Sequence, residues 1–253
     1  MHPKNTIFIG KVLHHFDVLP STNTYAQELL SKSRPADGTA IITDHQYQGR
    51  GQIGTTWDSE AGQNITLSVI LYPKFLQARQ QFLLSQAIAI GVSSFIAELV
   101  EKEVWIKWPN DIYIEDRKVC GLLIQNAISG RSLQNAIIGI GINLNQTQFA
   151  DQLKKATSIA IETGRHHTVF DILPDLFQAI ERNYLLLRKG EYDSIRELYL
   201  KRLYRYQTWQ QYEDNSGQIF RGRILGVSEQ GELQIQSEVE TIRSFALKEI
   251  KFL

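Results

Sequence analysis

The chain has 253 residues, of which 43% are hydrophobic, enough to bury the core of one large domain or of one domain with a small appendage. Lys plus Arg and Asp plus Glu both number 27, so no net charge favours nucleic acid or an anionic membrane, and any anion site has to be local. The single cysteine, Cys120, excludes an internal disulfide and a cysteine-cluster metal site, and it is expected to be a small core residue.

Neither the N-terminus nor the longest uncharged run predicts a membrane segment. Residues 1–10 lack the continuous apolar core of a signal peptide, which favours a cytoplasmic protein. The uncharged run at 80–97 approaches membrane length, but polar side chains interrupt it and its apolar residues follow helical spacing. We therefore expect a buried amphipathic helix over about 78–102.

The first structured segment is a strand over 10–19, followed by a helix over 24–31. Ser21 stands where the N-cap of that helix belongs, so Ser21, Thr22 and Asn23 line a strand-to-helix turn. Helix capping alone explains Ser21, and three hydrogen-bonding side chains in a row equally suit a small polar ligand. Both interpretations stay open.

The most informative segment is the loop Gly49-Arg50-Gly51-Gln52-Ile53-Gly54, which lies between strand-like runs at 39–43 and 65–71. Its three glycines let the backbone approach an anion, and Arg50 adds a planar cation, so the loop suits a phosphate or a carboxylate. The pattern matches the dinucleotide fingerprint, but a helix should follow that fingerprint and here a second strand follows. We expect a strand–loop–strand unit that binds a ligand, with a ligand-free hairpin as the alternative.

A second region rich in candidate site residues, Lys107-Trp108-Pro109-Asn110-Asp111, lies between short strands at 104–106 and 112–114. The proline ends one strand, so the lysine, the asparagine and the aspartate are predicted to sit on a rigid corner. A lysine beside a carboxylate and an amide suits a triphosphate with Mg²⁺. An ordinary Asn-Asp turn with exposed charges is the alternative.

Two apolar strands with glycines come next. The first, at 119–124, contains Gly121 and follows Lys118, a further candidate anion contact. The second, at 137–144, carries two glycines and a terminal amide, Asn143, and is predicted to be a central strand that floors a pocket. Relief of crowding by a helix is the alternative explanation of its glycines.

The C-terminal part divides into helices and then strands. Helical spacing over 169–189 and 192–205 predicts two helices that close the main domain, and short alternating segments from 206 onward predict a small antiparallel β-barrel. The fold class is thus α/β (α+β), a mixed β-sheet flanked by helices, with a catalytic domain at 1–205 and a barrel at 206–253. The histidine pairs His14-His15 and His166-His167 are adjacent, so they lack the spacing of a helical metal site.

Taken in this order, the motifs resemble those of the biotin protein ligases, from Ser21 to the C-terminus. That resemblance implies a biotin/lipoate ligase-like fold, which is class II synthetase-like, with a small C-terminal barrel. The stretches that carry it are Ser21-Thr22-Asn23, Gln46 through Trp57, Lys107-Trp108-Pro109-Asn110-Asp111, Arg117-Lys118-Val119-Cys120-Gly121 and Gly139-Ile140-Gly141-Ile142-Asn143.

The resemblance implies an ATP-dependent ligase that joins biotin to ATP, giving biotinyl-5′-adenylate, and then passes biotin to a lysine of a biotin carboxyl carrier domain. Because this reaction brings two anions together, cations and Mg²⁺ suffice, and no enzyme nucleophile is required. The implied site residues are, for catalysis, Lys107, Asp111, Arg50 and Lys118; for biotin, Ser21, Thr22, Asn23, Gln46, Arg50, Gly51, Lys118 and Gly121; for ATP, Gln52, Trp57, Lys107, Asn110 and Asn143; and for Mg²⁺, Asp111, Asn110 and Asn143.

The chain departs from the family pattern in two places. Only residues 1–20 precede Ser21, so we expect a ligase without the DNA-binding domain that many relatives carry, with no DNA or membrane partner, while the resemblance allows a homodimer. Gln52 and Ile53 stand where many relatives are more basic, which bears on how tightly the loop holds the adenylate. A lipoate protein ligase and a non-catalytic biotin or nucleotide sensor are the alternatives.

Overall fold

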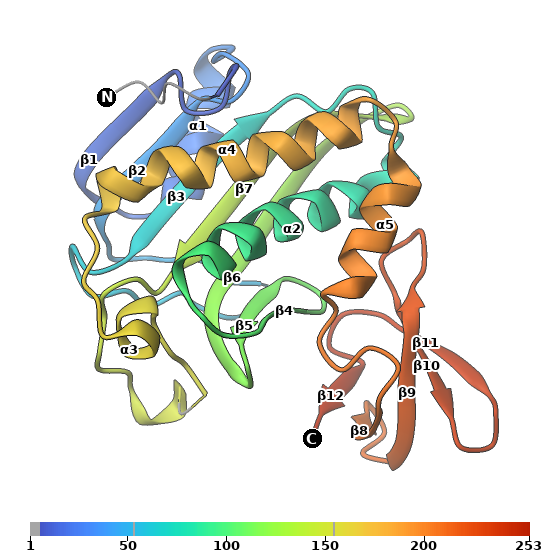
Figure 1. Cartoon of the computed structure of the whole chain (residues 1–253). Coiled ribbons are helices and arrows are strands. Elements are labelled where there is room, and N and C mark those ends of the chain that lie inside the picture. Colours follow the sequence, from blue (N-terminus) through green and yellow to red (C-terminus); the bar gives the residue numbers. More distant parts are fainter. Residues whose placement is uncertain (1–5, 53, 154) are drawn as a thin grey trace.

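The centre of the molecule is a seven-stranded mixed sheet with the strand order β1-β2-β3-β7-β6-β5-β4 (Figure 1). This computed structural model describes residues 6–52, 54–153 and 155–253, so Ile53 lies outside the described residues. β1 pairs with β2 in parallel, and the other neighbours are antiparallel. The strands are β1 Leu13–Leu19, β2 Ala40–Gln46, β3 Ile65–Leu71, β4 Val104–Lys107, β5 Asp111–Ile114, β6 Arg117–Ser129 and β7 Ser132–Ile142.

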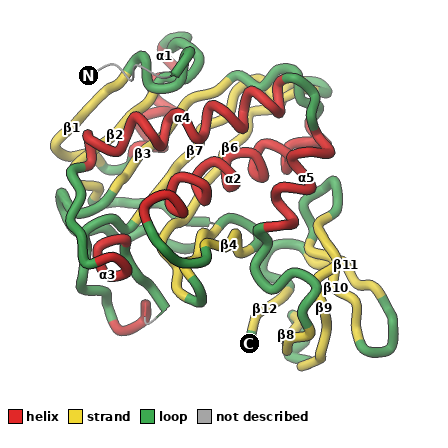
Figure 2. The backbone as a smooth tube through the Cα atoms, in the orientation of Figure 1, coloured by secondary structure: helices red, strands yellow, loops and turns green. Residues whose placement is uncertain are grey.

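Helices cover both faces of this sheet. On one face α1 (Thr22–Lys32) packs on β2, β3 and β7, and on the other face lie α2 (Gln81–Leu99) and α4 (Val169–Arg188) (Figures 1 and 2). Successive strand residues point to opposite faces, so neighbouring isoleucines such as Ile41 and Ile42 belong to two different apolar clusters. The predicted mixed sheet flanked by helices is confirmed.

The α2 helix is more apolar than the amphipathic helix expected from the sequence. With the short helix η1 (Ala78–Gln80) it is long and apolar enough to cross a membrane, yet 67% of its most apolar window is buried inside the fold. It contacts the sheet, α4 and α5 (Tyr192–Lys201), so little of its surface meets water. An apolar surface all round is the character of a core helix.

The C-terminal segment forms a second, antiparallel sheet of five strands in the order β11-β10-β9-β8-β12. The predicted antiparallel strands are confirmed, but among the described residues no pairing joins β11 to β12, so the sheet is open where we expected a barrel. The boundary at 205/206 falls between α5 and β8 and stays a prediction. The strands are β8 Trp209–Asp214, β9 Ile219–Val227, β10 Leu233–Ser237, β11 Ile242–Phe245 and β12 Ile250–Phe252.

Two features were absent from the sequence-based prediction. The β6–β7 hairpin extends to the turn at Gly130, because the pairing continues as far as Ser129 and Ser132 beyond the apolar core. Polar residues in that extension gave no strand pattern. The short helices η2 (Asp151–Leu153) and α3 (Ile159–Thr163) were also missed, since so few residues carry no periodicity.

Candidate active site

A cavity of about 330 Å³ lies on the α1 face of the large sheet, over β3, β7, β6 and β5. Its floor is set by strand register, because Thr66, Gly141, Gly121 and Asp111 stand opposite one another on these four strands. Most of the residues predicted for the site line it. They are Ser21, Thr22, Asn23, Gln46, Arg50, Gly51, Gln52, Trp57, Asn110, Asp111, Lys118 and Gly121.

Glycines leave the floor open to two side chains from other elements. A Cβ on Gly141 would lie 2.4 Å from the Trp57 indole, and a Cβ on Gly139 would lie 2.4 Å from Oδ1 of Asn23. Gly121 is nearly as close to Trp57, at 3.0 Å. Both sequence-based interpretations of these glycines therefore hold, since Gly139 makes room for a helix residue and Gly141 for Trp57, which follows the ligand loop.

One end of the cavity is neutral and internally hydrogen-bonded. The Thr22 amide donates to Oε1 of Gln46 at 2.9 Å, and the Ser68 hydroxyl lies 2.7 Å from Thr22 Oγ1 and 2.6 Å from Asn23 Oδ1. Asn23 Nδ2 in turn donates to Oε1 of Gln125 at 2.9 Å. Because each side chain is fixed by its neighbours, the wall is ordered before any ligand arrives.

Ser21 caps α1 and also lines the cavity, so its role in capping is confirmed and its contact with a ligand stays a prediction. Its hydroxyl accepts the Thr24 amide at 3.5 Å as the N-cap of α1, and the same residue lines the cavity. The cap turns the start of α1 toward the floor, which is why three consecutive polar residues reach one small volume.

The other end of the cavity carries the charges. Lys118 Nζ lies 2.7 Å from Asp111 Oδ1, and the same ammonium is 5.7 Å from the ring centre of Trp57. Trp57 Nε1 is buried and has no hydrogen-bond partner among the residues that the structure describes. A buried unpaired donor is costly, so this end of the cavity suits an acceptor brought by a ligand.

The ligand loop is a small hairpin held mainly by its own backbone. Gly51 donates to the Thr55 carbonyl at 3.0 Å, and Trp57 donates to the Gly49 carbonyl at 3.1 Å. Among its glycines Gly54 has positive φ, at +79°, whereas Gly49 needs the space, because a Cβ there would stand 2.1 Å from the Trp57 carbonyl. The strand–loop–strand expectation is met, since β2 precedes the loop and β3 follows it.

Lys107 on β4 stands opposite Asp111 on β5, so it continues the row of paired residues that forms the floor. It does not line the cavity. Its ammonium donates to the Tyr113 hydroxyl at 3.0 Å and lies 5.1 Å from the ring centre of Phe252 in the C-terminal sheet. Burial, above all, lowers the pKa of Lys107 below the usual lysine value, against the opposing effect of Asp111. The Tyr113 pKa rises to about 12 for the same reason, so its hydroxyl stays protonated.

The two asparagines expected to bind nucleotide or metal differ in position. Asn110 lines the cavity, with its amide nitrogen donating to the Leu122 carbonyl. Asn143 is buried outside the cavity lining, and its amide nitrogen donates to the Thr157 carbonyl at 2.9 Å. In this structure Asn143 ties the end of β7 to the segment before α3.

Several residues that line the cavity or hydrogen-bond to its wall were not predicted. Thr66 and Ser68 carry a usable signal, since two hydroxyls at alternate positions of an otherwise apolar buried strand point to one face. Gln125, which accepts from Asn23 Nδ2, belongs to the extended part of β6. Lys248 lines the cavity and comes from the turn between β11 and β12. No local pattern links Lys248 to the cavity, because the contact depends on how the second sheet packs.

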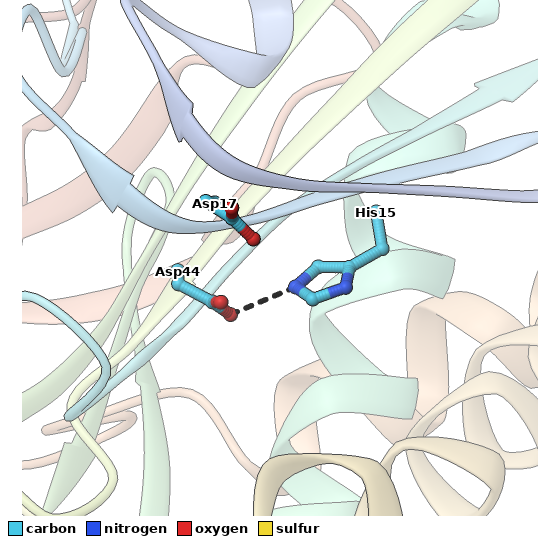
Figure 3. A group of neighbouring side chains, drawn as sticks. All are labelled: His15, Asp17 and Asp44. Atoms are coloured by element: carbon cyan, nitrogen blue, oxygen red, sulfur yellow. Dashed lines mark hydrogen bonds and ion pairs between the residues drawn. The ribbon is translucent and has the colours of Figure 1, made fainter.

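A cluster of three side chains with metal-ligand atoms lies elsewhere, on β1 and β2 (Figure 3). The ligand atoms of His15, Asp17 and Asp44 all fall within 4.8 Å of one another, and all three residues are exposed. His15 Nε2 lies 2.9 Å from Asp44 Oδ1. The adjacent histidine pairs did not reveal this cluster, because Asp17 is two positions along the strand and Asp44 lies on the neighbouring strand. An exposed ion pair of this kind contributes at most about 1 kcal/mol.

Comparison with known proteins agrees with this geometry. The Biotin/lipoate A/B protein ligase family model matches residues 15–143. The "Bifunctional ligase/repressor BirA" of Bacillus subtilis is 32% identical over 236 residues, covering 92% of this chain and 71% of that protein. The biotin–[acetyl-CoA-carboxylase] ligase of Mycobacterium tuberculosis is 27% identical over 161 residues, covering 61% of this chain and 58% of the relative.

The structural comparison extends over nearly the whole chain. The biotin protein ligase from Aquifex aeolicus, solved in complex with biotin and ATP, superposes with a TM-score of 0.78 at 26% identity and covers 96% of this chain and 99% of that one. The superposition includes both sheets, so it is not limited to the segment that the family model matches. The chain therefore belongs to the biotin/lipoate A/B protein ligase family.

Proposed function

We propose that this protein is an ATP-dependent biotin protein ligase, which forms biotinyl-5′-AMP from biotin and ATP and then transfers biotin to a lysine of a carrier protein. The observation that carries the proposal is that one cavity has both a neutral hydrogen-bonding end and a cationic end. Biotin has a neutral ring and a carboxylate at the end of its side chain, so it matches both ends of this cavity. The similarity to a ligase solved with biotin and ATP supports the same assignment.

The neutral end is the proposed site of the biotin ureido ring. A ureido group has two N–H donors and one carbonyl acceptor, and the wall offers hydroxyl and amide groups of both kinds. Ser21, Thr22, Asn23 and Gln46 are the proposed contacts, with Gly121 on the floor beneath the ligand.

The cationic end is where the biotin carboxylate meets the α-phosphate. Arg50, Gly51 and Lys118 are placed there in the proposal, and the Lys118 ammonium leaves Asp111 to contact the ligand. The carboxylate oxygen bonds to the α-phosphorus as the bond to the leaving pyrophosphate breaks. Fixed cations stabilise the charge that accumulates, and the barrier falls without an enzyme nucleophile.

The nucleotide is proposed to extend from the same point. Trp57 offers an aromatic face and an N–H that has no partner among the described residues, and Gln52 and Asn110 lie in the same cavity lining. Lys107 is proposed to reach the phosphates by giving up its hydrogen bond to Tyr113. Asn143 is proposed to act indirectly, by holding the segment before α3 in place.

The donor set also fits an Mg²⁺ ion that the phosphates help to hold. Asp111 and Asn110 are adjacent and both line the cavity, and oxygen ligands of this kind with substrate phosphates suit Mg²⁺. Asn143 is the weakest of the three proposed ligands, since its side chain lies outside the cavity lining. When bound, the ion would offset phosphate charge.

The proposal is tested by incubating the protein with ATP and a biotin carboxyl carrier domain, together with either radiolabelled biotin or radiolabelled lipoate. Pyrophosphate release together with label on the carrier lysine is the expected result. Label from lipoate instead would assign the related ligase, and biotin binding without pyrophosphate release would assign a sensor. The finer expectations of a cytoplasmic location, a homodimer and no DNA partner are tested by fractionation, light scattering and gel shift.

A further inference from the structure

A second cavity, of about 280 Å³, adjoins the first one. The two share Gln52, Asn110, Leu122 and Leu123, so a group in the second cavity can approach the charged end of the first. Its other walls come from the start of α2, the Trp108-Pro109 corner and two turns of the C-terminal sheet. The apolar lining includes Phe82, Trp108, Pro109, Ile124 and Leu247.

The two cavities differ in charge. The lining of the first includes the cations Arg50, Lys118 and Lys248. Among the described residues that line the second there is no lysine or arginine, and the one charged side chain is Glu232. A triphosphate or pyrophosphate is attracted to the first cavity and repelled from the second, because a carboxylate disfavours a neighbouring anion.

We infer that the second cavity receives the side chain of the acceptor lysine, and that Glu232 binds its ammonium group. The inference rests on the proposed function, in which a lysine has to reach the acyl carbon of the adenylate. A lysine side chain is an apolar stem with a positive end, and the cavity is apolar with a negative residue. Shape, polarity and charge therefore select the same occupant.

The turn that carries Glu232 is fixed against the catalytic domain. The Ser228 hydroxyl accepts the Glu232 amide at 3.1 Å and lies 3.4 Å from Glu232 Oε2. The neighbouring Gly231 carbonyl accepts Trp108 Nε1 at 2.8 Å, and Gly231 has positive φ at +92° with Phe82 beside it. These contacts hold the carboxylate at the cavity wall instead of leaving it on a free surface loop.

The transfer step balances with this arrangement. The lysine ammonium loses one proton to give the free amine, and the nitrogen then bonds to the acyl carbon of the adenylate. The carbon–oxygen bond to the phosphate breaks, AMP leaves with the electron pair, and the nitrogen loses a second proton to give the amide. Glu232 holds the ammonium before the first proton leaves and is a candidate acceptor for it.

Glu232→Gln tests the inference, with Glu229→Gln as the matched control. Glu229 lies in the same turn, but it is exposed, pairs with Arg196 at 3.6 Å and does not line the second cavity. Adenylate is formed on each protein from biotin and ATP, and single-turnover reaction is then followed with a carrier domain, with Nα-acetyl-lysine amide and with neutral hydroxylamine. A variant that fills the cavity, Ala246→Trp, completes the set.

The expected result is a roughly tenfold slower transfer to the carrier domain and to the lysine amide in Glu232→Gln, since a charge-assisted hydrogen bond is lost. Pyrophosphate release and reaction with hydroxylamine stay within about twofold of the unmodified protein, and Glu229→Gln matches it throughout. Ala246→Trp forms adenylate but transfers it poorly. Equal transfer rates in Glu232→Gln, or an equal loss with hydroxylamine, overturn the inference. Failure of the unmodified protein to form adenylate overturns the proposed function instead.

Discussion

The two ends of the first cavity are built by different means. At the neutral end, Thr22, Asn23 and Ser68 are rooted in a helix and a strand and hydrogen-bond to one another. At the charged end, Lys118 is neutralised by Asp111, and Arg50 is exposed on a loop. The neutral end can bind a ligand as it stands, whereas the charged end has to exchange internal contacts for ligand contacts.

This difference indicates a division of labour. A preformed hydrogen-bonding wall loses little freedom on binding, so it favours affinity and selection of the ring. Cations that move from internal partners to a ligand act when the anions meet, which favours the reaction step. Substitutions at the neutral end are therefore expected to act on ring binding alone, whereas substitutions at the charged end are expected to act on binding of the anions and on the reaction step.

The largest effect is expected from Lys107→Ala. Loss of one positioned cation costs about 3 kcal/mol in the transition state, so adenylate formation is expected to slow about a hundredfold while biotin affinity stays unchanged. Pyrophosphate release and biotin calorimetry measure the two quantities. Tyr113→Phe is the control, because it removes the hydroxyl that the lysine contacts and keeps the charge. A near-normal rate in Lys107→Ala would remove this residue from the reaction.

The same lysine gives a pH dependence with a defined sign. Its pKa in the folded protein is below the usual 10.5, mainly because of burial. The charged form is thus lost as pH rises through that lowered value, and adenylate formation is expected to fall before an ordinary lysine would titrate. Lys107→Arg should shift this alkaline limb upward, because arginine keeps its charge.

Lys118→Ala is expected to weaken biotin and adenylate binding about thirtyfold and ATP binding much less. The ammonium lies between Asp111 and Trp57, where the carboxylate end of biotin is proposed to bind, and a charge-assisted contact contributes roughly 2 kcal/mol. Calorimetry with each ligand is the measurement. Equal losses for biotin and ATP would move Lys118 to the nucleotide.

Gly139→Ala is expected to weaken biotin binding about tenfold, because its Cβ would stand 2.4 Å from Asn23 Oδ1 and disturb the neutral wall. Gly141→Ala is the matched comparison. There the Cβ would stand 2.4 Å from the Trp57 indole, so ATP binding should suffer more than biotin binding. Identical binding profiles for the two variants would contradict the separation of the two ends.

The smallest effect is expected from Gln52→Arg. Gln52 lines both cavities, and a cation there would add a charge-assisted contact to the adenylate phosphate. A gain of about 1 kcal/mol lengthens the residence of biotinyl-adenylate about fivefold, as measured by release of labelled product into excess unlabelled biotin. An unchanged release rate would place Gln52 in solvent.

The sequence was informative where the chemistry is concentrated in short stretches. The glycine loop, the Lys107–Asp111 corner and the glycines of β6 and β7 were located because each motif carries its own turn or strand pattern. The direction of Lys107 was not predictable, since Phe252 lies far along the chain. Lys248 and Glu232 were missed for a related reason, as each reaches a cavity only through the packing of the second sheet.

The bond from Trp108 to the Gly231 carbonyl bears on how such proteins can be recombined. The corner that presents Asn110 and Asp111 also contacts the C-terminal sheet, through the bond from Trp108 to Gly231. Gly231 fits there because it has no Cβ to clash with Phe82. In a chimera that exchanges only the second sheet, the new turn would clash with Phe82 unless it also has a glycine at position 231. Exchange of the corner, the start of α2 and the turn together is the smallest modular unit that this architecture permits.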